Sequence, residues 1–122
     1  MFDDWPIIHT YTRAQALADG VLVDISAMAH EVGFQWSVAV TQAVWAIIQE
    51  IPTRFEGIQS VDGRLWDLVW MASLAVRRNS GTETLFRLIM HHGQKTYQTF
   101  KLVAGPGDVG EPVITIMLPN ED

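Results

Sequence analysis

The amino-acid sequence predicts one α+β domain over residues 1–122, with helices first and an antiparallel sheet after them. The length of 122 residues suits a single domain with its own core. Apolar positions recur at helical spacing in most of the chain up to residue 79. After residue 83, β-branched and aromatic residues dominate, and short polar turns interrupt them. Helices followed by a run of strands are typical of the α+β class.

The first predicted helix lies near the N-terminus and leads into a short strand. Thr12 and Gln15 have the spacing of a capping box, in which two side chains close the first turn of a helix. Gly20 can end that helix because glycine adopts the left-handed conformation at low cost. Residues 21–25 are mostly β-branched and predict a short strand.

Two more helices are predicted before residue 52. Ser26 is a candidate N-cap for a short helix over residues 27–32. Ser37 is a candidate N-cap for a helix over residues 38–50, and Pro52 prevents that helix from continuing. The first half of the chain is therefore expected to be mainly helical.

A long central helix is predicted over residues 63–79, with Asp62 as its N-cap. Its apolar positions cover nearly the whole circumference, so we expect it to lie between layers of the domain. Trp66, Trp70 and Leu74 form a second apolar face of this helix. These three residues would alternatively line the two-fold contact of a homodimer.

The C-terminal part predicts a three-stranded antiparallel meander. Residues 84–91 and 95–103 are rich in β-branched and aromatic residues, and a His-Gly-Gln turn at 92–94 separates them. Residues 104–111 form a glycine-rich loop, and residues 112–118 alternate enough to predict a third strand.

Short motifs that could bind a cofactor or a metal fail on their context. The GPGDVG segment at 105–110 has the spacing of a dinucleotide fingerprint, but a strand starting at Pro112 follows where that motif needs a helix. His30 is followed four positions later by Phe34 rather than by a second histidine, which excludes a zinc motif of that type. The adjacent His91 and His92 point to opposite faces of a strand. We expect no cofactor and no metal.

No catalytic motif is present, so we expect that the protein is not an enzyme. The serines lack the glycine-flanked context of a hydrolase nucleophile. Asp67 is the one acid in strongly apolar surroundings, on the predicted central helix. An enzyme with an unrecognised site stays open as an alternative, and it predicts a pocket with convergent polar groups around Asp67.

The charge distribution argues against nucleic-acid binding and for a basic protein partner. The chain has 14 acidic and 8 basic residues, a formal net charge of −6 at pH 7. Residues 1–61 contain seven acids and two bases, which gives −5 of that total. An acidic surface repels nucleic acid and attracts a basic surface.

The composition also predicts a cytoplasmic protein. Cysteine is absent, which is consistent with a reducing compartment. The N-terminal segment carries two aspartates where a secretory signal would carry lysine or arginine. No stretch reaches the roughly 18 uninterrupted apolar residues of a membrane span.

Trp45 is the candidate anchor of a partner-binding surface. On a projection of the predicted helix over residues 38–50, its indole falls within the polar stripe, opposite the valines and isoleucines. An exposed indole beside carboxylates would suit a basic partner. We expect Asp19, Asp24 and Glu50 to supply those carboxylates around Trp45.

Four blocks of sequence carry a family resemblance. They are YTRAQALADGVLVDIS (11–26), FQWSVAVTQAVW (34–45), GRLWDLVWMASLAVRR (63–78) and AGPGDVGEPVITIMLPNED (104–122). These blocks resemble a family of short phage- and plasmid-borne proteins whose domain has no assigned function. The resemblance extends in order over nearly the whole chain, and the ADGVLVD, GRLWD and GPGD-GEPVITIMLP strings are its most specific parts.

The resemblance implies an accessory protein of a mobile element that works in the bacterial cytosol. Such proteins often act by binding, and antagonists of host defence, of the anti-CRISPR or anti-restriction type, are a prominent class. We therefore expect a protein that binds a host defence complex. A self-associating regulatory or structural protein of the mobile element is the first alternative, and the unrecognised enzyme is the second.

Overall fold

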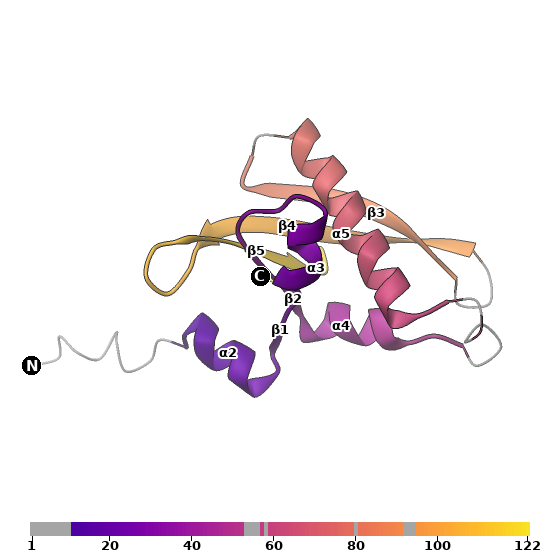
Figure 1. Ribbon diagram of the computed structural model, residues 1–122, viewed down its shortest axis with the longest axis horizontal. Coiled ribbons are helices and arrows are strands. Elements are labelled where there is room, and N and C mark those ends of the chain that lie inside the picture. Colours follow the sequence, from indigo (N-terminus) through magenta and orange to yellow (C-terminus); the bar gives the residue numbers. More distant parts are fainter. Residues whose placement is uncertain (1–10, 53–56, 58, 80, 92–94) are drawn as a thin grey trace, which may run out of the picture.

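A computed structural model describes residues 11–52, 57, 59–79, 81–91 and 95–122 of the chain (Figure 1). Four helices and five strands are formed by these residues. In chain order they are α2 (Arg13–Asp19), β1 (Leu22–Asp24), α3 (Ser26–Glu31), β2 (Ser37–Thr41), α4 (Gln42–Gln49), α5 (Val61–Arg78), β3 (Glu83–His91), β4 (Lys95–Pro106) and β5 (Pro112–Met117).

The five strands form one mixed sheet in the order β1-β2-β5-β4-β3. β2 and β5 are parallel, and the other three neighbouring pairs are antiparallel. The last strand of the chain therefore lies in the middle of the sheet, between the N-terminal pair and the β3–β4 hairpin. Figure 1 shows α5 lying across the β4 and β3 side of this sheet.

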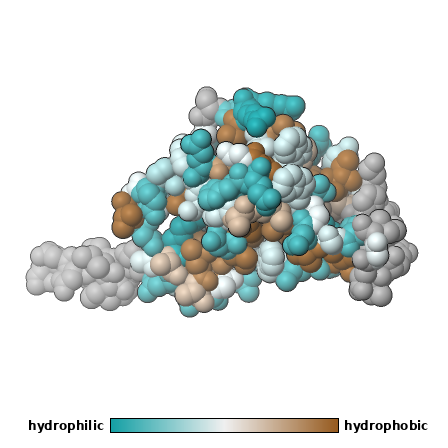
Figure 2. Space-filling view, viewed as in Figure 1, coloured by the Kyte–Doolittle hydropathy of each residue, from teal (hydrophilic) through white to brown (hydrophobic). Residues whose placement is uncertain are grey.

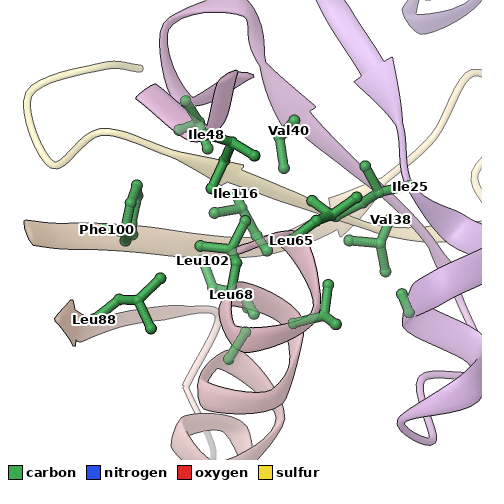
Figure 3. Packing of buried hydrophobic residues seen from close by; sticks show 14 of the residues in the cluster. Ile25, Val38, Val40, Ile48, Leu65, Leu68, Leu88, Phe100, Leu102 and Ile116 are labelled. Atoms are coloured by element: carbon green, nitrogen blue, oxygen red, sulfur yellow. The ribbon is translucent and has the colours of Figure 1, made fainter. Parts of the chain in front are cut away.

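The core lies between the sheet and the helices α3, α4 and α5 (Figure 3). Alternate residues of each strand point into it, as the two-residue period of a strand requires. The largest of the fully buried side chains are Phe100, Ile48, Leu68, Ile116, Val38, Val40, Val44 and Val69.

The predicted helix over residues 38–50 is wrong in its first third. Residues Ser37–Thr41 form β2, and α4 starts only at Gln42, capped by the Thr41 hydroxyl. β2 lies between two neighbouring strands, and Val38, Ala39 and Val40 are all buried. A strand covered on both faces is a continuous apolar run, which periodicity does not distinguish from a buried helix.

The predicted three-stranded meander is also wrong as a description of the sheet. The β3–β4 hairpin is present, and β5 pairs antiparallel with β4. However, β5 also pairs in parallel with β2, so the sheet has five strands and is mixed. The α+β class is confirmed, and the turn predicted at residues 92–94 lies outside the described residues.

The helix ends follow the predicted capping chemistry with two shifts. Thr12 and Gln15 form the capping box of α2, and Gly20 ends that helix at a φ of 79°. The N-cap of α5 is Ser60, whose hydroxyl accepts from the Gly63 amide, and not Asp62. The short helix α3 starts at Ser26 itself, and the Asp24 carboxylate accepts from the Ser26 amide and hydroxyl.

No helix in the described part of the chain is long and apolar enough to span a membrane.

Candidate functional site

The predicted anchor Trp45 lies on α4 and is half-buried against the core. The Trp45 side chain is therefore less exposed than a partner-binding anchor was expected to be. In the described part of the chain, the tryptophans with the most open side chains are Trp36, Trp66 and Trp70, which are 45%, 40% and 44% exposed. Binding of a partner at Trp45 stays a prediction.

The three carboxylates expected around Trp45 lie at the ends of three different elements. Asp19 ends α2 and accepts a hydrogen bond from the Tyr11 hydroxyl at 2.6 Å. Asp24 ends β1, and its carboxylate accepts hydrogen bonds from the Ser26 amide and hydroxyl. Glu50 is the C-cap residue of α4. All three are exposed, so each remains accessible to a basic partner.

A continuous groove runs along the line where α5 meets β3. It consists of three adjoining hollows with volumes of about 340, 280 and 550 Å³. The first and second hollows share Asp67, Leu88 and Ile89. The second and third share Met71, Arg87 and Tyr97. We call this feature the α5–β3 groove.

The helical wall of the α5–β3 groove carries the three residues predicted as a self-association face. Trp66 lines the first hollow, Trp70 the second and Leu74 the third. They are spaced four residues apart, so they follow one another along one side of the helix. Figure 2 shows hydrophobic side chains reaching the surface over α5, with hydrophilic ones between them. The predicted sandwiching of α5 between two layers is therefore incomplete, because this side of the helix is open.

The strand wall of the groove is also apolar at its surface. Leu85 is 63% exposed, and Ile89 and its cross-strand partner Tyr97 are exposed as well. The Arg87 guanidinium lies over the Tyr97 ring, 4.9 Å from its centroid, in cation–π geometry. Large apolar side chains that gather at a surface usually mark an interaction site.

β3 is an edge strand, and half of its backbone hydrogen-bonding groups face outward. In the described residues it pairs with β4 on one side only. The Ala104 amide donates to the Thr82 carbonyl at 2.8 Å, so this pair is hydrogen-bonded across the hairpin. Because hydrogen-bonded and non-hydrogen-bonded pairs alternate, the backbone groups of Glu83, Leu85 and Arg87 point to the open edge.

The polar groups at the Trp66 end of the groove are mostly engaged in the structure itself. Arg64 is buried and donates to the carbonyls of Ile47 and Glu50 and to the Gln59 side chain. Asp67 lines the first two hollows, and desolvation raises the pKa of its carboxyl above the usual range. The enzyme alternative required further convergent polar groups around this carboxylate, and it stays a prediction.

A smaller, acidic hollow of about 230 Å³ lies at the start of α2. Asp24, Asp108 and Glu111 line it together with Arg13. Asp108 accepts from the Arg13 and Ala14 amides, at 2.8 and 3.0 Å, and these bonds lower the pKa of its carboxyl. Asp108, in the loop predicted at 104–111, thus caps the N-terminus of α2, which is distant in sequence.

Desolvation lowers the pKa of the Arg13 guanidinium, which donates to the Thr115 hydroxyl and the Ile114 carbonyl.

Within the ranges that the structure covers, no group of three or more acidic or histidine side chains could hold a metal ion.

The whole chain matches one family model. The protein belongs to a family of unknown function, DUF6573. The model of this family covers residues 1–122. Comparisons with curated proteins and with solved structures find no match. Membership of DUF6573 confirms the resemblance to a family without an assigned function, and it adds no site residues to those described above.

Sequence reasoning found the helical wall of the α5–β3 groove but missed its strand wall. Trp66, Trp70 and Leu74 stood out because they form a second apolar stripe on one helix. Leu85, Arg87 and Ile89 gave no such signal, because alternation shows that a strand has two faces and not that it lies at an edge.

Proposed function

We propose that the protein acts by binding another protein chain through the α5–β3 groove, rather than by catalysis. The observation that carries this proposal is the pair of open indoles, Trp66 and Trp70, above an apolar groove next to a strand edge with which no described residue pairs. Tryptophan and arginine are the side chains most often found as energetic anchors of protein interfaces. An open strand edge adds backbone hydrogen bonds to such an anchor.

The groove suits a protein partner better than a small molecule. Its three hollows follow one another along α5, and neighbouring hollows share lining residues. Small-molecule sites usually enclose most of the ligand surface in one concave pocket. An extended polypeptide segment or a second strand covers such a line along its whole length.

Site-specific photo-crosslinking in bacterial cells tests the proposal. A benzophenone amino acid replaces Tyr97, which lines the groove and is 66% exposed. We expect a covalent adduct with a protein, which mass spectrometry then identifies. The double variant Trp66→Ala/Trp70→Ala should reduce that adduct at least about tenfold, because each indole is an anchor.

The control places the same photo-crosslinker at Trp36, which is as exposed as the groove tryptophans. Trp36 leads into β2, which β5 and β4 separate from β3. Equal capture from both positions, or capture at Tyr97 that the double variant leaves unchanged, would contradict the proposal.

A host defence complex is the second candidate partner, proposed from the resemblance to phage- and plasmid-borne proteins. The acidic hollow at the start of α2 supports it, because Asp24, Asp108 and Glu111 gather there and a basic surface would complement them. This surface and the groove involve different strands, so one protein can use both.

A pull-down from bacterial lysate tests this second proposal. We expect the wild type to recover a nuclease or effector complex. Recovery should be weaker with the Asp24→Asn/Glu111→Gln variant at low ionic strength, and weaker with the wild type at raised ionic strength. Asp108 is left intact in these variants because it closes α2. Recovery that is insensitive to the two substitutions and to salt would rule out the acidic surface as the contact.

A further inference from the structure

We propose that the open edge of β3 pairs with β3 of a second copy of this chain, in antiparallel orientation and centred on Leu85. The inference rests on the proposed function, because it names the occupant of the α5–β3 groove. Two five-stranded sheets would then join into one continuous sheet across a two-fold axis.

The outward-facing backbone groups of β3 favour a strand as the partner, because a strand supplies hydrogen bonds that an apolar surface does not. The backbone groups of Glu83, Leu85 and Arg87 face outward, and the side chains of Leu85 and Ile89 are exposed beside them. Long apolar edges of this kind are aggregation-prone unless they are covered. Pairing with an identical edge satisfies the backbone groups and closes the sheet to further addition at that side.

The side chains of β3 select one register among the symmetric ones. Centring the pair on Leu85 places Glu83 of one copy opposite Arg87 of the other, twice, with the two Leu85 side chains between them. Centring it on Phe86 would place Arg87 opposite Leu85. Centring it on Arg87 would place two guanidinium groups opposite each other, which is destabilising. Of these three registers, the one centred on Leu85 pairs opposite charges.

This register also agrees with the direction of the backbone groups. Glu83, Leu85 and Arg87 are the residues whose amides and carbonyls point outward, and they would pair with one another across the axis. The two Leu85 residues would exchange both of their hydrogen bonds. A register with the axis between Leu85 and Phe86 would place the outward-facing groups of Leu85 opposite the inward-facing groups of Phe86, whereas the register centred on Phe86 is set apart by its side chains alone.

The helix wall of the groove extends the same contact. A two-fold axis perpendicular to a sheet keeps both copies of α5 on the same face. Leu74 and Leu85 line the same hollow, so the axis through Leu85 passes near the C-terminal half of α5. The apolar contact would therefore continue from the strand seam to the two helices. Of the three residues predicted for self-association, Leu74 lines the hollow of Leu85, Trp70 the next hollow and Trp66 the one after it.

Sedimentation equilibrium of the purified full chain tests the inference, with four proteins compared over a concentration series. The wild type should form a dimer. The Glu83→Arg variant should dissociate at least about tenfold more readily, because two attractive cross-strand pairs become repulsive. The Arg87→Glu variant should do the same. The double variant Glu83→Arg/Arg87→Glu should regain dimerisation, because it restores both pairs with their charges exchanged.

Thermal unfolding by circular dichroism confirms that each variant is folded, and a folded monomer is the expected state of the single variants. Failure of the double variant to recover, with its fold intact, would overturn the Leu85-centred register. A monomeric wild type at high concentration would overturn the second copy as occupant. In that case the photo-crosslink at Tyr97 decides separately whether the groove binds a different protein, so the two proposals fail in distinguishable ways.

Discussion

Arg64 joins two helices from a buried position, and replacing it with methionine should destabilise the domain strongly. Its side chain is only 5% exposed. Nη1 donates to the Ile47 carbonyl at 3.2 Å and to the Glu50 carbonyl at 2.9 Å, both at the end of α4. Nε and Nη2 donate to Oε1 of Gln59 at 3.0 and 2.8 Å. Methionine keeps the apolar stem of the side chain and removes all of these donors.

The expected loss in the free energy of unfolding follows from the acceptors that are left behind. The Ile47 carbonyl keeps a hydrogen bond from the Glu50 amide, at 3.2 Å. The Glu50 carbonyl and the Gln59 side chain lose a charged donor, and such bonds contribute about 1.5–3 kcal/mol each. Glu50 is exposed and Gln59 is half-buried, so water replaces part of what is lost. We expect a net loss of about 3 kcal/mol, and a melting temperature lower by about 10 °C.

Urea unfolding of the wild type, Arg64→Met and Arg77→Met measures this loss. Arg77 is the matched control, because it lies exposed in the last turn of the same helix. Its substitution removes a favourable charge at the helix C-terminus, which contributes about 0.3–1 kcal/mol. The midpoint should fall much further for Arg64→Met, with an unchanged dependence on urea concentration. Equal midpoints for the two variants would refute the view that this guanidinium holds α4 against α5.

Replacing Asp67 should stabilise the domain, whereas replacing Asp108 should destabilise it. Asp67→Asn should raise the melting temperature at pH 7 slightly, because desolvation raises the pKa of this carboxyl, while its exposed position keeps the penalty on its charged form small. Asp62→Asn, in the first turn of the same helix, should instead lower it slightly. A lower melting temperature for Asp67→Asn would contradict this. Asp108→Asn should lower the melting temperature at pH 7 and reduce its fall in acid, measured from pH 7 to pH 2. The amide bonds to Asp108 lower the pKa of its carboxyl, so their stabilisation is complete above the unfolded pKa of about 3.9 and is lost as the pH falls through the lower, folded value. An unchanged acid transition would refute this role.

Local chemistry made most elements predictable from the sequence. The capping box at Thr12 and the glycine at position 20 fix α2, and both depend only on residues within one helix. The alternation after residue 83 gave the β3–β4 hairpin for the same reason. The N-cap of α5 was displaced by two residues because Ser60 and Asp62 are both good caps, and sequence preference does not choose between them.

The errors concern contacts between distant parts of the chain. Thr41 and Ser37 are both suitable N-caps, and pairing of β2 with β5 decides that the helix starts after Thr41. Trp45, which was expected on the open polar side of its helix, is half-buried against the core that this sheet completes. Asp108 resembled part of a nucleotide-binding loop, and its partners in α2 could not be known without the fold. The edge position of β3 depends on the strand order, which has no local signal.

The central position of β5 has a consequence for how the protein folds during synthesis. The β1–β2 pair and the β3–β4 hairpin connect residues that are close in sequence, so both can form before β5 joins them. Neither can join the other until β5 has left the ribosome, because Val40 and Leu102 both meet Ile116. Until then β2 and β4 each present an unpaired edge, and the nascent chain is exposed to aggregation and to chaperones at that stage.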